Sequence, residues 1–182
     1  MKNRFKEIDC FILAGGQSNP GEDFQPHGEL TRLEKGYRNY ARLFEKVTLV
    51  LKKDQAREWY LNYPHVCDES PELGPVHGVE AALNSAESDV VFIGSADIYD
   101  FPAELVAELI RNYDGELFLG YRMKSTKSSG VQPLFGLYNK KLAARLRQQH
   151  TDHPVNLASL LKAEGRLLPL PASIPAEQIG LH

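Results

Sequence analysis

The chain has 182 residues, of which 42% are hydrophobic and 25% charged, a composition typical of a globular protein. A formal net charge of −3 provides no basic field for binding a nucleic acid backbone, so we expect no nucleic-acid partner. Apolar runs such as 90–93 are too short to cross a bilayer, and residues 1–7 lack the apolar segment of a signal peptide. We therefore expect a cytoplasmic protein with no membrane partner.

The two cysteines, Cys10 and Cys67, both stand in apolar runs. Two cysteines do not make a disulfide framework, so reduced thiols in a cytoplasmic protein are the expected state. No internal repeat or low-complexity stretch divides the chain. The sequence therefore predicts a single domain over residues 1–182.

Strands and helices are expected to alternate along the chain. A continuous apolar run at 10–14 ends at two glycines, which favours a strand buried on both faces. The further expected elements, in chain order, are a loop at 17–28, a helix at 30–44, a strand at 47–51, a helix at 54–60, strands at 65–67 and 90–93 separated by a helix at 76–87, a helix beginning near 102, strands at 117–119 and 133–138, helices at 140–149 and 157–163, and an irregular proline-containing tail. Gly36 interrupts the first helix pattern and costs about 1 kcal/mol there.

This alternation predicts an α/β fold: a three-layer α/β/α sandwich with a mostly parallel, Rossmann-like sheet. Ligands of such sheets bind beyond the carboxyl ends of the strands. The loops that follow Ala14 and Ile93 are therefore the first places to look for a site.

The first candidate site is the segment from Leu13 to Ser18, which reads Leu-Ala-Gly-Gly-Gln-Ser. Gly15 and Gly16 allow backbone N–H groups to approach a ligand, and consecutive amides in a turn bind anions such as phosphate. The segment matches neither a P-loop nor a Gly-x-Gly-x-x-Gly motif. From the residues alone, a purely structural turn is the alternative.

The second candidate is Asp97, shortly after the apolar run at 90–93. A carboxylate at this edge can hold Mg²⁺ that bridges substrate phosphates, because Mg²⁺ typically takes one or two carboxylates and keeps waters. Asp100 lies further from the strand. It could support the metal site without touching the metal, but part of the cap of the next helix, near Pro102, is the preferred interpretation.

The third candidate begins at Asp68 and continues through Gly74 and Pro75 to Gly78, where a Gly-Pro turn starts a helix. An acidic side chain there can accept hydrogen bonds from guanine N–H groups or a ribose hydroxyl, and a helix N-terminus is itself an anion site. The alternative is a surface loop that merely begins the helix.

A basic, polar stretch at 122–130 includes Arg122 and could clamp a polyanionic substrate, although a solvated loop is the default interpretation. The chain contains no Gly-x-Ser-x-Gly, His-Glu-x-x-His or Cys-x-x-Cys motif. Hydrolase, zincin and thioredoxin functions therefore receive no support.

Taken in order, these segments resemble the MobA-like nucleotidyltransferases, the molybdenum cofactor guanylyltransferase family. That family opens with a strand and Leu-Ala-Gly-Gly-x-Ser, as at 13–18, and continues with an acidic residue and Gly-Pro-Leu-x-Gly, matched by Asp68 and 74–78. Asp97 and Pro102 match its next strand end, and 132–138, Gln-Pro-Leu-Phe-Gly-Leu-Tyr, match a later segment. The four motifs cover about the first 140 residues.

The resemblance implies transfer of GMP from GTP to a molybdopterin phosphate, with Mg²⁺ as cofactor and pyrophosphate as leaving group. It implies that Asp97 is the catalytic residue that holds Mg²⁺ and that Asp68 recognises guanine. The implied nucleotide-binding residues are Leu13, Ala14, Gly15, Gly16, Ser18, Asp68, Gly74, Pro75 and Gly78. A protein partner in molybdoenzyme maturation is also an expectation.

The chain departs from the family pattern after Ser18. The family continues with an Arg and a Lys that contact the triphosphate, whereas residues 19–27 here include neither and contain Glu22 and Asp23. Arg32, Lys35 or the basic stretch could substitute. The alternatives are a nucleotidyltransferase using another nucleoside triphosphate, an inactive binding or regulatory relative, and an unrelated α/β domain.

Overall fold

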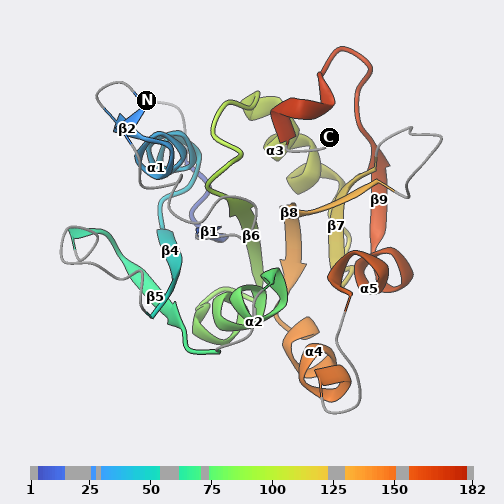
Figure 1. Ribbon diagram of the computed structural model, residues 1–182. Coiled ribbons are helices and arrows are strands. Elements are labelled where there is room, and N and C mark those ends of the chain that lie inside the picture. The colour runs from blue at the N-terminus through green and yellow to red at the C-terminus, as the bar shows by residue number, and fades with distance from the viewer. Residues whose placement is uncertain are drawn as a thin grey trace.

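The computed structural model describes residues 4–14, 26–27, 30–53, 62–70, 74–122, 130–150 and 156–179 (Figure 1). The strands are β1 (Asp9–Leu13), β2 (Pro26–His27), β3 (Leu30–Thr31), β4 (Val47–Lys52), β5 (His65–Asp68), β6 (Val90–Ser95), β7 (Phe118–Arg122), β8 (Val131–Asn139) and β9 (Arg166–Pro169). The helices are α1 (Arg32–Leu43), α2 (Pro75–Ser85), α3 (Ala103–Asn112), α4 (Leu142–His150), α5 (Leu157–Glu164) and the short 3₁₀ helix η3 (Ala176–Ile179).

Seven strands form one sheet in the order β5-β4-β1-β6-β8-β7-β9, and β2 pairs with β3 separately. Strands β5, β4, β1 and β6 are mutually parallel, and β9 is parallel to β7. Only β8 runs against its neighbours β6 and β7 in this sheet of described residues. The predicted mostly parallel sheet is therefore confirmed.

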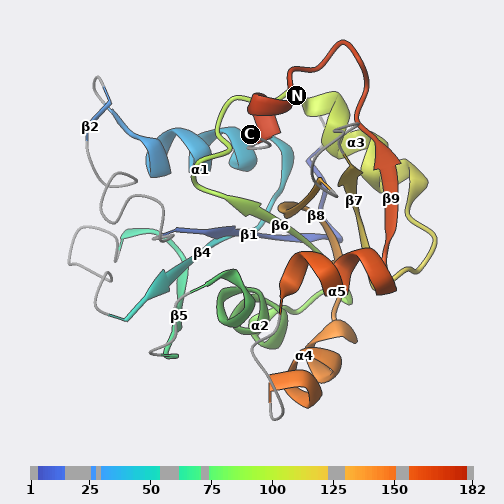
Figure 2. The same ribbon diagram turned by 45° about the vertical axis from the view of Figure 1, so that its right-hand side comes forward.

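Helices cover both faces of the sheet, as Figure 2 shows. One face packs against α1 and α3 through side chains such as Leu33 and Val106, and the other packs against α2, α4 and α5 through Val79, Leu146 and Leu160. This arrangement confirms the three-layer α/β/α sandwich. Within the described part of the chain, no helix is both long and apolar enough to cross a membrane.

Strand β1 is buried at all five of its positions, as its apolar run predicts. Cys10 and Ile12 face the layer that contains α1, whereas Phe11 and Leu13 face the layer that contains α2. Successive side chains of a strand point to opposite faces, so a strand between two helical layers needs apolar residues at every position. Both cysteines are free thiols, but Cys67 is only partly buried.

The tail differs from its sequence-based description. Residues 166–169 form the edge strand β9 beside β7, and residues 176–179 form η3, so the prediction of an irregular tail was wrong for these two segments. Ile179 is fully buried in the same core cluster as α1 and α3. The expected helix at 54–60 and most of the expected loop at 17–28 lie outside the described residues.

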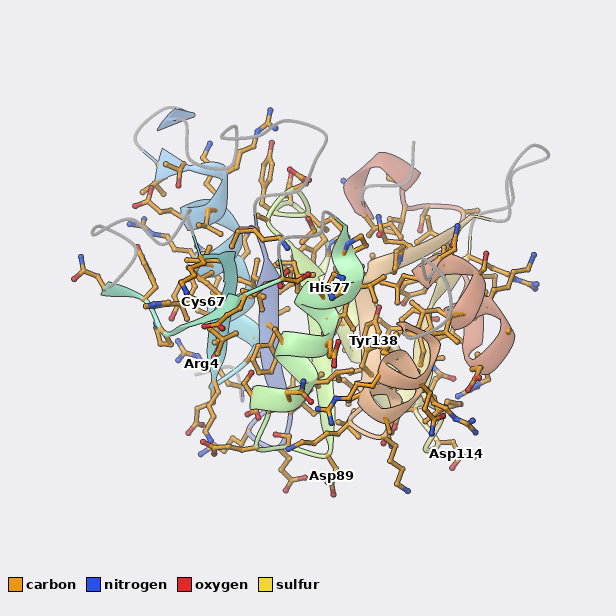
Figure 3. All side chains as sticks on the ribbon, turned by 60° about the horizontal axis from the view of Figure 1, so that its bottom comes forward. Arg4, Cys67, His77, Asp89, Asp114 and Tyr138 are labelled. Carbon is orange, nitrogen blue, oxygen red and sulfur yellow. The ribbon has the colours of Figure 1, made fainter. Side chains whose placement is uncertain are left out.

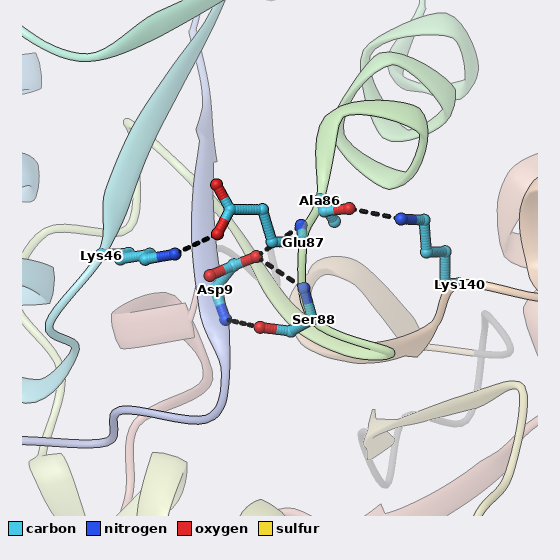
Figure 4. Close-up of polar contacts among 6 residues, drawn as sticks. All are labelled: Asp9, Lys46, Ala86, Glu87, Ser88 and Lys140. Atoms are coloured by element: carbon cyan, nitrogen blue, oxygen red, sulfur yellow. Dashed lines mark hydrogen bonds and ion pairs between the residues drawn. The ribbon is translucent and has the colours of Figure 1, made fainter.

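A buried carboxylate fixes the amino-terminal edge of the sheet (Figure 4). Asp9 is 6% exposed and accepts hydrogen bonds from the backbone N–H groups of Glu87 and Ser88, at 2.8 and 2.9 Å. The Asp9 N–H donates to Ser88 Oγ, and Lys46 pairs with the Glu87 carboxylate. This network ties the start of β1 to the connection between α2 and β6, at the opposite edge from the candidate site.

Candidate functional site

The carboxyl ends of β1 and β6 lie side by side where the chain changes direction across the sheet. Leu13 is in register with Ser95, and the N–H of Ala96 donates to the Leu13 carbonyl at 2.9 Å. In the sheet, β4 and then β5 lie on one side of β1, and β6 lies on the other side. A parallel sheet binds its ligands at such a switch point. Ala14 stands at this edge, whereas Gly15, Gly16 and Ser18 lie outside the described residues.

Asp97 lies two residues beyond the end of β6, directly at this switch point. Its side chain is exposed, and its carboxylate makes no hydrogen bond or ion pair with another described residue. Ile98 anchors the turn that carries Asp97, because Ile98 is 2% exposed and its N–H donates to the Ser95 carbonyl at 3.1 Å. The Asp97 N–H faces Ser95 Oγ at 3.4 Å. The carboxylate therefore projects from an anchored turn toward solvent.

Helix α1 packs closely beneath the same turn. Gly36 is buried, and a Cβ placed on it would lie 3.5 Å from the Ala96 carbonyl oxygen and 3.8 Å from Tyr99 Cβ. Asn39 donates its side-chain N–H to the Tyr99 carbonyl. The glycine that weakens the helix pattern therefore allows α1 to approach the turn that carries Asp97.

Asp68 ends β5 and is 5% exposed, so its carboxylate is buried rather than free in a loop. Lys52, at the end of β4, stands opposite it in register and places Nζ 2.7 Å from Asp68 Oδ2. The Ser70 N–H donates to Asp68 Oδ1 at 3.0 Å, and Lys52 Nζ donates to the Ser70 carbonyl at 3.0 Å. Sequence analysis did not identify Lys52.

The Gly74–Gly78 segment starts α2 at the same edge. Gly74 has φ +125° and ψ 165°, a backbone conformation for glycine, and Pro75 is the first helical residue, where its missing N–H is harmless. Gly78 is buried, and a Cβ on it would meet Leu13 Cδ2 at 2.9 Å. Gly78 therefore brings α2 close to the end of β1. Figure 3 shows His77 in the first turn of α2, far from Asp89 beyond its other end.

The reversed strand β8 brings its first residues to the same edge. Gln132 donates from Nε2 to the Ile179 carbonyl at 2.7 Å and accepts from the Leu134 N–H at 3.0 Å. This glutamine, which stands in the segment resembling the family's Gln-Pro-Leu-Phe, therefore anchors η3.

Besides Lys52 and Lys53 at the end of β4, basic residues reach this edge from two further described elements. Arg32 and Lys35 lie in the first turn of α1, which must begin at the edge where β1 ends, because α1 returns the chain antiparallel to β4. Arg122 ends β7 at this edge and is exposed. Residues 123–129 of the basic stretch lie outside the described residues. The described residues contain no group of three or more His, Cys, Asp or Glu side chains that could hold a metal ion.

One buried hydroxyl near the site has no partner among the described residues. Tyr40 of α1 is fully buried, and its hydroxyl packs on Gly94 of β6 without a hydrogen bond. Burial, reinforced by the neighbouring Cys10, raises the pKa of the Tyr40 hydroxyl well above its ordinary value. The Tyr40 hydroxyl is therefore neutral where α1 packs on β6. Asp100 is exposed like Asp97, but it does not cap α3, whose N-cap is Pro102 without a side-chain hydrogen bond.

Solved structures share this fold. A crystal structure of a protein from Aquifex aeolicus has a TM-score of 0.75 and 24% identity, covering 98% of this chain and 96% of that one. The molybdopterin-guanine dinucleotide biosynthesis protein A of Archaeoglobus fulgidus has a TM-score of 0.71 and 15% identity, covering 89% and 83%. The fold is thus the Rossmann-like fold of nucleotidyltransferases.

Sequence comparison identifies the family to which the chain belongs. The model of the MobA-like NTP transferase domain matches residues 10–167, and the chain belongs to that family. The "Probable molybdenum cofactor guanylyltransferase" of Carboxydothermus hydrogenoformans is 31% identical over 143 residues, 75% of this chain and 68% of that protein. The molybdenum cofactor guanylyltransferase of Serratia proteamaculans is 28% identical over 166 residues, 88% of this chain and 82% of that protein.

Proposed function

We propose that this protein is a Mg²⁺-dependent guanylyltransferase that transfers GMP from GTP to a molybdopterin phosphate and releases pyrophosphate. The observation that carries the proposal is the position of Asp97, an exposed carboxylate on an anchored turn at the β1/β6 switch point. The names of the relatives support the choice of nucleotide and acceptor.

The site suits Mg²⁺, because this cation prefers carboxylate oxygen and accepts one protein carboxylate together with substrate phosphates. Asp97 would hold Mg²⁺, which when bound neutralises charge on the triphosphate. In the reaction an acceptor phosphate oxygen forms a bond to the α-phosphorus in line, and the bond from that phosphorus to pyrophosphate breaks. The electron pair of the broken bond leaves with pyrophosphate.

The remaining proposed roles belong to residues along the carboxyl edge of the sheet. Backbone groups of Leu13 and Ala14, with Gly15, Gly16 and Ser18, would cradle the phosphates, and the start of α2 at Gly74 and Pro75 would lie beside them. Gly78 would allow α2 to pack closely against Leu13. Asp68 would accept hydrogen bonds from guanine N–H groups. Arg32, Lys35 and Arg122 are basic residues at this edge that would supply the positive charge absent from residues 19–27.

The test is pyrophosphate release from GTP, with molybdopterin as acceptor and Mg²⁺ titrated. Asp97→Ala and Asp97→Asn should both lower turnover by at least about 100-fold, because each removes an anionic ligand at the site of charge development. Asp100→Asn is the matched control, since it changes an exposed carboxylate three residues away and should retain activity. Equal turnover for the wild type and Asp97→Ala, with both folded, would contradict the assignment of Asp97.

The alternatives are resolved by thermal shifts with GTP, CTP, ATP and UTP, each with and without Mg²⁺. A ligand at about 100 times its dissociation constant stabilises the fold by about 2.7 kcal/mol. A shift with another nucleotide alone favours a different nucleotidyltransferase. No shift with any nucleotide favours a binding relative, for which the acidic Glu22 and Asp23 and the absent Arg and Lys are the supporting observations.

A further inference from the structure

The ion pair between Lys52 and Asp68 is unusual in this structure because Lys52 is largely shielded from solvent and Asp68 is buried. Their exposed fractions are 16% and 6%. By contrast, at least one partner is 43% or more exposed in the ion pairs Lys6–Glu45, Lys46–Glu87, Arg145–Glu164, Arg147–Glu80 and Arg166–Glu116. Removing two charges from water carries a desolvation penalty that mutual attraction only partly offsets, so a buried pair is weak evidence for a role in stability. Its position calls for another explanation.

That position is the ligand edge of the sheet. Lys52 ends β4 and Asp68 ends β5, and the two residues are direct register partners. Three strand spacings separate β5 from β6 and Asp97, which is about 14 Å at the usual spacing. This distance is within the reach of a nucleotide whose phosphates lie at β1 and β6 and whose base lies at the ends of β4 and β5.

The contacts around Asp68 fix the direction of its carboxylate. Lys52 Nζ donates to Oδ2, the Ser70 N–H donates to Oδ1, and Lys52 also donates to the Ser70 carbonyl, closing a ring of three contacts. A carboxylate oxygen has about two lone-pair sites, so each oxygen keeps acceptor capacity after these bonds. The carboxylate can thus present two adjacent acceptors in one orientation.

We propose that Lys52 is a positioning residue that holds the Asp68 carboxylate as a paired acceptor for the N1–H and 2-amino groups of guanine, and thereby sets the preference for guanine nucleotides. The inference rests on the proposed function and adds to it the residue that determines base preference. Guanine alone among the common bases offers two adjacent N–H donors on this edge. Adenine and cytosine offer an amino group beside a ring acceptor, and uracil offers one N–H between two carbonyls.

The experiment compares GTP with ITP, which lacks the 2-amino group, in the wild type and in Lys52→Met, Lys52→Gln and Lys52→Arg. KM and kcat are measured for pyrophosphate release, and dissociation constants by calorimetry. Lys53→Met is the matched control, because Lys53 is the exposed neighbour of Lys52. Folding of each variant is checked by circular dichroism and thermal melting.

Wild-type protein should prefer GTP over ITP by about 10-fold or more, the value of a hydrogen bond to a charged group. Lys52→Met should raise KM for GTP by a similar factor, change kcat less, and bring the GTP/ITP ratio close to unity. Lys52→Arg should recover much of the ratio, because a guanidinium can also bridge a carboxylate. Lys53→Met should keep the wild-type ratio.

The outcomes separate the two proposals. Wild-type protein that binds neither GTP nor ITP overturns both the proposed function and this inference. Wild-type turnover of GTP together with an unchanged GTP/ITP ratio in folded Lys52→Met overturns the inference alone. If Lys52→Met does not fold, the same decision is taken from Lys52→Gln, and an unchanged ratio there overturns the inference.

Discussion

Gly36 offers the sharpest link between packing and the candidate site. In an exposed helix, replacing glycine by alanine raises stability by about 0.8–1 kcal/mol. At Gly36 the added Cβ would lie 3.5 Å from the Ala96 carbonyl oxygen and 3.8 Å from Tyr99 Cβ, both ordinary contacts. Gly36→Ala should therefore raise the free energy of unfolding by up to about 1 kcal/mol and keep Mg²⁺-dependent turnover.

A larger side chain at the same position should have the opposite effect. Leucine adds three further carbons directed at the turn of residues 96–99, and such overpacking typically costs about 1–3 kcal/mol. Gly36→Leu should displace Asp97, so that pyrophosphate release falls and more Mg²⁺ is needed for half-maximal activity. Urea denaturation and Mg²⁺ titration measure the two effects, with Arg38→Ala as an exposed control on α1. The reasoning is refuted if Gly36→Ala destabilises by more than about 1 kcal/mol, or if folded Gly36→Leu titrates with Mg²⁺ like the wild type.

Three further substitutions test the packing by chemical denaturation. Asp9→Ala removes the acceptor of two backbone N–H groups and should lower the free energy of unfolding by about 3 kcal/mol; a loss below about 1 kcal/mol would contradict the network at the amino edge. Tyr40→Phe removes a buried hydroxyl without a partner and should raise the free energy of unfolding by about 1 kcal/mol. A clear decrease would instead reveal a partner, such as a buried water. Gly74→Ala places a Cβ at φ +125° and should lower the free energy of unfolding by about 1–3 kcal/mol. An unchanged denaturation midpoint would contradict that backbone conformation.

The central part of the fold is predictable from the sequence because its strands are buried on both sides. The apolar run of β1 and the run that opens β6 predict their positions to within two residues. Strand β9 gives no such signal, since Leu167 and Leu168 are only half buried and its sole strand partner is β7. An edge strand of four residues depends on a partner more than forty positions away in the chain, which no local pattern contains.

The candidate site is likewise only partly predictable from the sequence. Asp97 is found from sequence because it directly follows a buried strand, and the structure places it beside the end of β1. Lys52 is missed because its contact with Asp68 depends on the register between β4 and β5. A signal did exist, since each of the two expected strands is followed by a residue of opposite charge. Parallel neighbours bring such ends together, so the pairing could have been proposed from the expected topology.

The burial of Ile179 has a consequence for the order in which the protein folds during synthesis. Strand β1 has two neighbours in the sheet, of which β4 follows it by about forty positions in the chain and β6 by about eighty, which is about 4–16 s after β1 at the usual rate of translation. Ile179 completes the core beneath α1 and α3 only after all the described strands have been made. The nascent chain therefore exposes part of that apolar layer for most of its synthesis, and this half of the molecule is where a chaperone would find a binding surface.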